Sequence, residues 1–137
     1  MYSSIRQIQW AFNKKGLKYR TDDLFGNQIL RASMKGKYGE YTFLFIKDDD
    51  EGNDVAIRTL PLVRVPNSRR KEACILLNSF QQRYRYARFV IDKDGDVNVS
   101  YDFLVACQDI GECAVDVLMK MCGVLDACYP ELMRFIW

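Results

Sequence analysis

The sequence predicts an α+β fold: an antiparallel sheet of about five strands, with helices packed on one side. Three observations lead to this prediction. Apolar residues recur at helical spacing in three separate segments, the period changes to two in two other regions, and the links between predicted strands are short. Short links favour antiparallel pairing. The predicted order is helix, three strands, helix, two strands and helix, forming a single domain over residues 1–137.

The first predicted helix has clear signals at both ends. Ser3 or Ser4 can cap its start, because a hydroxyl oxygen accepts a hydrogen bond from a free N–H of the first turn. Ile8 and Phe12 lie on one face of this helix. Gly16 supplies the left-handed residue that often ends a helix. We therefore expect an amphipathic helix over about the first fifteen residues.

The next part of the chain predicts a meander of three strands. These strands cover about residues 28–35, 40–47 and 54–60. In the middle strand, Phe43 and Phe45 point to one face, whereas Leu44 and Ile46 point to the other. Both faces of this strand are therefore expected to be at least partly covered, as in a central strand.

A second helix and a hairpin follow. The helix begins at Ser68 and has an apolar face that includes Phe80. Asp94-Gly95 is a strong hairpin signal, because both residues tolerate the positive φ angles of a tight turn. Alternation on either side of this turn places Phe89 on the same face as Val99.

The last predicted helix has more apolar surface than one sheet face can bury. Asp109 and Glu112 form a capping-box-like start, and Tyr129-Pro130 permits a break or kink at about residue 129. One broad face is apolar, and the apolar character extends to a second face at Val115, Met119 and Cys122. Because a monomer rarely exposes a large apolar patch, we expect this second face to contact another molecule.

Composition excludes several classes of function. The chain has 20 Lys and Arg against 18 Asp and Glu, so its net charge is only +2 and no nucleic-acid partner is expected. No long uncharged apolar run predicts a membrane span. Histidine is absent, which removes Ser-His-Asp and Cys-His sites and histidine-based zinc sites. We expect no enzyme activity, no metal site and no cofactor.

The five cysteines indicate a reducing, cytoplasmic compartment, because their number is odd and no pair has C-x-x-C spacing. Cys74, Cys122 and Cys128 are predicted to be core thiols. Only Cys113, just inside a helix start, has the setting that a reactive thiolate needs.

Two acidic segments and one mixed segment have competing interpretations. Residues 48–54 and 92–96 are interpreted as a solvated loop and a hairpin turn, with weak cation binding left open. Residues 83–88 (RYRYAR) interleave arginines with tyrosines, which suits backbone tracking and base stacking. The favoured interpretation places Tyr84 and Tyr86 on the second face of the sheet.

Several segments share a pattern with a known family. They are residues 55–66 (VAIRTLPLVRVP), 76–78, 83–86, 89–97, 101–102 and 129–133. Over about residues 17–137 the chain resembles the YbjN domain family of bacterial sensory transduction regulators. The resemblance implies the fold of type III secretion chaperones and a bacterial cytoplasmic location, and it supplies no catalytic residues. Gln81 departs from the family pattern, which often has Asn at this position.

These observations predict a non-enzymatic bacterial protein-interaction module, regulatory or chaperone-like, that holds a protein partner or forms a homodimer. The candidate contact residues are Val115, Met119 and Cys122 on the last helix, and Leu44, Ile46, Tyr84 and Tyr86 on the second sheet face. The alternative is a small-molecule-sensing domain with a pocket between sheet and helices. The residues expected to line that pocket are Phe43, Phe45, Tyr101 and Phe103.

Overall fold

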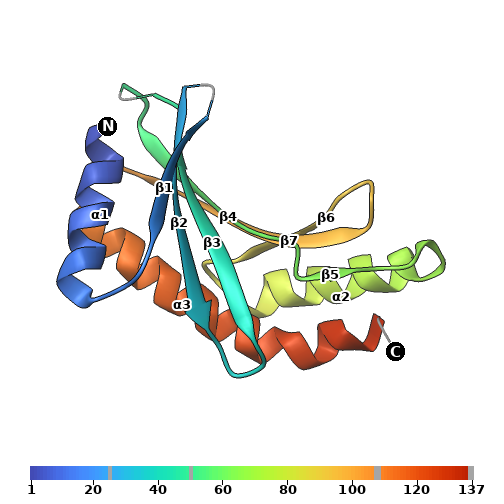
Figure 1. The fold of residues 1–137 in the computed structure, drawn as a ribbon. Helices are drawn as coiled ribbons and strands as arrows, with labels where there is room; N and C mark the ends of the chain where they lie inside the picture. The colour runs from blue at the N-terminus through green and yellow to red at the C-terminus, as the bar shows by residue number, and fades with distance from the viewer. Residues whose placement is uncertain (25, 50, 107–108, 136–137) are drawn as a thin grey trace.

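The structure, a computed structural model, describes residues 1–24, 26–49, 51–106 and 109–135 (Figure 1). Its helices are α1 (Ser3–Lys15), α2 (Arg70–Arg83) and α3 (Ile110–Leu132), with short 3-10 helices at Asn67–Arg69 and Met133–Phe135. Its strands are β1 (Arg20–Leu24), β2 (Asn27–Lys35), β3 (Glu40–Lys47), β4 (Asp54–Thr59), β5 (Val63–Arg64), β6 (Arg88–Ile91) and β7 (Asp96–Leu104).

The strands form one antiparallel sheet in the order β1-β2-β3-β4-β7-β5, with β6 paired to β7. The predicted α+β class is confirmed, and β2, β3 and β4 lie where the meander was expected. β3 is central, because it pairs with β2 on one side and β4 on the other. The predicted hairpin is also confirmed, with Phe89 opposite Val99.

Two strands were not predicted from the sequence. β1 has the sequence RTDDL, which lacks apolar alternation, and it exists as a strand because Thr21 pairs with Leu30 of β2. β5 has only two residues and pairs with the start of β7. Both strands depend on the neighbouring strand rather than on their own sequence pattern, and the sheet therefore has seven strands rather than about five.

The three helices pack on one side of the sheet, and aromatic side chains join each helix to a strand (Figure 1). Phe12 of α1 meets Phe45 of β3 edge-on at 5.5 Å between ring centroids. Phe80 of α2 lies 4.9 Å from Phe89 of β6. Tyr129 of α3 lies 6.1 Å from Tyr41 of β3. The core therefore lies between one face of the sheet and the helices.

The predicted start of α3 agrees with the structure, whereas its predicted end at about residue 129 does not. The start is confirmed, because the Asp109 carboxylate accepts a hydrogen bond from the Glu112 N–H at 3.0 Å. Of the break or kink that Tyr129-Pro130 permits, the break does not occur, because the helix continues through Pro130 to Leu132. Proline removes one helical hydrogen bond, but Leu132 and Phe135 are buried beyond it, and this burial offsets the loss.

Among the described residues, no helix has the length and hydropathy of a membrane span.

Candidate functional site

The side of the sheet that faces away from the helices is the main candidate surface, and we call it the open face. Directly opposite residues of antiparallel strands point to the same side, so the register defines rows of side chains across this face. One row is Arg20, Arg31, Leu44, Arg58, Ser100 and Arg88. The next row is Asp22, Ile29, Ile46, Ala56 and Asp102.

The centre of the open face is apolar. Ile29, Ile46 and Ala56 are consecutive in one row, and Leu44 is beside them in the other row. All four are half-buried, and we call this set the apolar strip. Two of the predicted contact residues, Leu44 and Ile46, therefore do lie on the second face of the sheet.

The candidate surface on α3 is largely covered. Val115 is only 5% exposed, and Cys122 is half-buried, so the prediction that Val115 is a free contact residue is wrong. The reason is α1, which packs so closely on α3 that a Cβ atom at Gly111 would lie 2.7 Å from the Ala11 Cβ atom. Val115 is one turn further along the same side of α3. Met119 alone of the three remains exposed, at 44%.

The two tyrosines of the mixed segment lie on the helix side, not on the second face as predicted. Tyr84 is half-buried against the core, with its ring 6.5 Å from that of Phe80. Tyr86 packs edge-on against Tyr101 at 5.7 Å, and the Lys120 ammonium lies 5.4 Å from its ring. The φ angle of Tyr86 is +62°, which is rare for a bulky residue.

A depression of about 710 Å³ lies between β7 and α3, where the sensing alternative expected a pocket. Tyr101 and Phe103 line this depression together with Tyr86. Acidic residues of α3 also line it. Burial raises the pKa of the Tyr101 hydroxyl above its usual value. Phe43 and Phe45 do not line this depression, because both are completely buried in the core.

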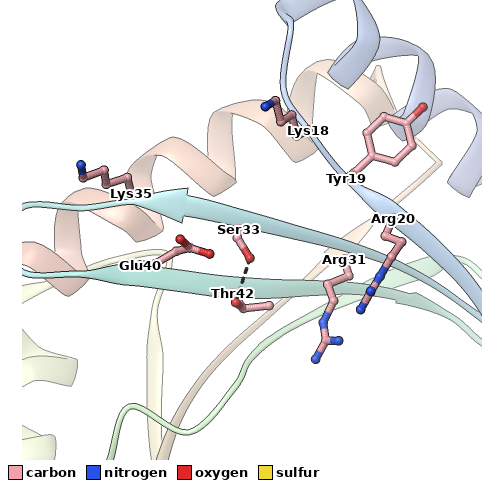
Figure 2. A pocket seen from close by; sticks show the side chains of 8 residues that line it. All are labelled: Lys18, Tyr19, Arg20, Arg31, Ser33, Lys35, Glu40 and Thr42. Carbon is pink, nitrogen blue, oxygen red and sulfur yellow. Dashed lines mark hydrogen bonds between the residues drawn. The ribbon is translucent and has the colours of Figure 1, made fainter.

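A second depression, of about 590 Å³, lies on the β1–β2 side of the sheet (Figure 2). Its lining residues are Lys18, Tyr19, Arg20, Arg31, Ser33, Lys35, Glu40 and Thr42. The lining therefore contains four cationic side chains and one carboxylate. Sequence reasoning missed this cluster because it missed β1, which brings residues 18–20 beside β2. Gly26, whose positive φ angle of +84° suits a tight turn, was the signal that could have predicted the β1–β2 hairpin.

The acidic turns are organised by the chain itself. The buried Lys47 ammonium donates hydrogen bonds to the carbonyl oxygens of Gly52 and Asp54, at 2.6 and 3.0 Å. In the hairpin turn, the Asp92 carboxylate accepts hydrogen bonds from the N–H groups of Asp94 and Asp96. Within the part of the chain that the structure describes, no three His, Cys, Asp or Glu residues are grouped to hold a metal ion.

Three of the described thiols are not poised for reaction. Burial raises the pKa of Cys113, Cys122 and Cys128, in the last case to about 12. Cys113 therefore has the opposite of the depressed pKa that a reactive thiolate needs. Cys74 is exposed, so the prediction that it is a core thiol is wrong. Cys107 lies outside the described residues.

The fold and its surfaces define a class: an antiparallel sheet covered by helices on one face and open on the other. The profile of the YbjN family, described as "Putative bacterial sensory transduction regulator", matches residues 7–123. The chain belongs to this family, which confirms the resemblance seen in the sequence.

A solved structure supports the same fold. The crystal structure of YbjN from E. coli, described as "a putative transcription regulator", is similar with a TM-score of 0.58 over 93% of this chain and 92% of that chain. The two sequences are 10% identical, so this likeness concerns the fold alone. No curated protein matches the chain significantly.

Proposed function

We propose that this YbjN-family chain is a non-enzymatic bacterial regulatory module that binds a partner protein through the apolar strip on the open face. The observation that carries the proposal is the strip itself: Ile29, Leu44, Ile46 and Ala56 are contiguous on three adjacent strands, on the side of the sheet away from the helices. Burial of apolar surface is the main favourable contribution to protein association. The family description as a regulator supports the same class of function.

The surroundings of the strip resemble a protein interface, which has an apolar centre and a polar rim. Arg31 and Arg58 are the direct cross-strand neighbours of Leu44. Asp22 and Asp102 end the row that contains Ile46. A partner with apolar side chains at its centre and charged groups around them fits this arrangement. A second copy of the chain, related by a two-fold axis, is the simplest such partner.

The cytoplasm is the compartment that we propose for this interaction. Among the described residues, four cysteines are free thiols, and only one of them, Cys128, is fully buried. The other three are Cys74, Cys113 and Cys122. Free thiols persist in a reducing compartment. Regulation by partner binding needs no catalytic residue, and the raised pKa values of the half-buried and buried thiols leave them poor nucleophiles.

Leu44→Glu tests the proposed contact surface. The new carboxylate would lie between the guanidinium groups of Arg31 and Arg58, so the domain is expected to stay folded. We expect this variant to lose the partner that the unchanged protein captures from its native cell, because a charge would be buried in an apolar contact. Light scattering on the purified proteins would show whether that partner is a second copy.

Met119→Glu is the matched control, because it adds the same charge to the exposed residue of α3. Circular dichroism and thermal melting should show both variants to be folded. Capture that survives Leu44→Glu but is abolished by Met119→Glu would contradict the proposal and favour the helix surface.

A second candidate function, sensing of a small molecule, is favoured by the depression between β7 and α3. Its volume of about 710 Å³ is within the usual range of ligand pockets, and Tyr86, Tyr101 and Phe103 supply aromatic surface. A saturable rise in melting temperature with one metabolite, lost in Tyr101→Ala, would support sensing. If no metabolite in a broad screen raises the melting temperature, partner binding remains the better explanation.

A further inference from the structure

We infer that the depression beside β1 and β2 binds a small phosphate-bearing molecule. It lies where the start of β1 meets the second half of β2 and the start of β3 (Figure 2). Lys18, Arg20, Arg31 and Lys35 line it, together with a single carboxylate, that of Glu40. The lining thus has a formal charge of +3, four cations minus one anion. This inference concerns a different site from the apolar strip and does not depend on it.

The central observation is a pair of arginines directly opposite each other. Arg20 and Arg31 are cross-strand partners, and Figure 2 shows both side chains pointing to the same side of the sheet. Like charges in this position destabilise a sheet. Across the described residues, no salt bridge or side-chain hydrogen bond is formed by either guanidinium. An anion that bridges both groups would remove the repulsion.

Other arginines of the same row are already satisfied. Arg58 pairs with the Asp102 carboxylate at 2.6 Å, and Arg88 donates to the Ser100 hydroxyl at 3.0 Å. Arg58 and Arg88 thus each have a hydrogen-bond partner in the row, and the two guanidinium groups without one among the described residues are those of the Arg20–Arg31 pair. The pair lies where the surface is hollowed, so a ligand could reach both guanidinium groups.

The chemistry around the pair suits phosphate better than a single carboxylate. A guanidinium is a planar fork that can donate two parallel hydrogen bonds to phosphate oxygens. The hydroxyls of Ser33 and Thr42, 2.9 Å apart, offer further hydrogen-bonding groups in the same depression. A phosphate monoester has a charge of roughly −1.5 to −2 near neutral pH, so one or two phosphate groups match the +3 lining.

The surrounding charges favour a compact ligand over a nucleic-acid strand. Asp22 lies in the next row on the open face, and Asp102 at the far end of that row already neutralises Arg58. A phosphate backbone that continued across the open face would meet these carboxylates. Arg31 is also the cross-strand partner of Leu44, so a bound phosphate would lie next to the apolar strip. Ligand binding and partner binding could then influence each other.

Isothermal titration calorimetry with pyrophosphate, at physiological ionic strength, tests the inference. We expect saturable binding that is weakened about tenfold or more in the double variant R20Q/R31Q, because both forked donors are lost. The matched control is Arg85→Gln, which removes an exposed arginine outside the depression and should leave the affinity unchanged. Thermal melting keeps the result interpretable: R20Q/R31Q should be at least as stable as the unchanged protein, because a like-charge pair is removed.

Three outcomes would overturn the inference. One is no saturable binding of pyrophosphate. Another is equal binding of citrate, which would indicate only general attraction of anions. The third is tighter binding of a short single-stranded DNA or an acidic peptide, which would assign the same arginines to a macromolecular partner. Pyrophosphate is titrated into the purified protein without any partner, so failure of this inference is distinguishable from failure of the partner capture that tests the apolar strip.

Discussion

Lys47 shows how one side chain can organise an acidic loop. Its side chain is almost completely buried, at 2% exposed, and its ammonium group donates to two carbonyl oxygens of the loop between β3 and β4. The Asp49 carboxylate accepts hydrogen bonds from the N–H groups of Glu51 and Gly52. A lysine is normally exposed, so this role could not be predicted from the residue type. The cation that hydrogen-bonds to the loop carbonyls is thus a side chain of the protein itself.

Lys47→Met should lower the free energy of unfolding by about 2 kcal/mol, because methionine keeps most of the apolar stem but leaves two part-buried carbonyl oxygens without the ammonium donor. Urea unfolding followed by circular dichroism measures this change. Lys71→Met, on the exposed surface of α2, is the control and should change stability little. Equal effects of the two substitutions would show that the hydrogen bonds of Lys47 contribute no net stability.

Gln81 is a second residue whose role only the structure reveals. Its amide group donates to the Phe89 carbonyl oxygen at 2.8 Å and accepts from the Phe89 N–H at 3.1 Å. It therefore joins α2 to the backbone of β6. The sequence showed only a departure from the Asn that is frequent in the family. The longer glutamine side chain can still form a two-point amide contact with the strand.

At the scale of elements, the contact between α1 and α3 decides how much apolar surface remains exposed. A Cβ atom at Gly111 would lie 2.7 Å from both the Ala11 Cβ atom and the Gln7 carbonyl oxygen. Glycine at this position allows the two helices to approach closely. This close approach covers Val115, which sequence reasoning had left for a partner.

Gly111→Ala should therefore destabilise the protein by about 1–3 kcal/mol, because the added methyl group overpacks the contact between α1 and α3. Gly123→Ala is the matched control in the same helix, since nothing lies within 4 Å of its Cβ position. It should stabilise α3 by about 0.5–1 kcal/mol. Thermal unfolding of the two variants measures both effects, and a stabilising Gly111→Ala would contradict the packing described.

Elements with a strong internal pattern were predictable, and elements formed by pairing were not. The first helix was predicted over its full length, and its end is confirmed by Gly16, whose φ angle is +72°. However, neither serine caps its start, because the N-cap residue is Tyr2. β1 escaped prediction because its polar sequence becomes a strand only beside β2. As a result, the cationic depression could not be predicted from sequence.

At the scale of the whole molecule, the burial of two tyrosine hydroxyls and one cysteine thiol predicts that the protein is less stable at high pH. Burial raises the pKa of Tyr41, Tyr101 and Cys128, and a hydrogen bond to Asp126 further raises that of Tyr41. The fold therefore favours their neutral forms. This contribution is fully present below the unfolded pKa values, about 8.5 for thiols and about 10 for tyrosine, and it is lost as pH rises through the higher folded values.

Urea unfolding at a series of pH values tests this prediction. The free energy of unfolding should fall as pH rises above about 9. Tyr41→Phe should be less stable near neutral pH, because it loses the hydrogen bond to the Asp126 carboxylate, which measures 2.7 Å. However, its stability should fall less steeply above about pH 10, because phenylalanine has no hydroxyl whose pKa is raised by folding. Parallel pH profiles for the two proteins would contradict the role assigned to Tyr41.

Local patterns in the sequence determined the α+β class, the central meander, the hairpin at Asp94-Gly95 and the family. These features depend on residues close together in the chain, whose periodicity and turn chemistry are local. Tertiary structure decided which surfaces are free. It covered Val115 with α1, turned Tyr84 and Tyr86 to the helix side, and placed Arg20 opposite Arg31. Contacts of this kind join distant segments, and no local pattern records which faces will meet.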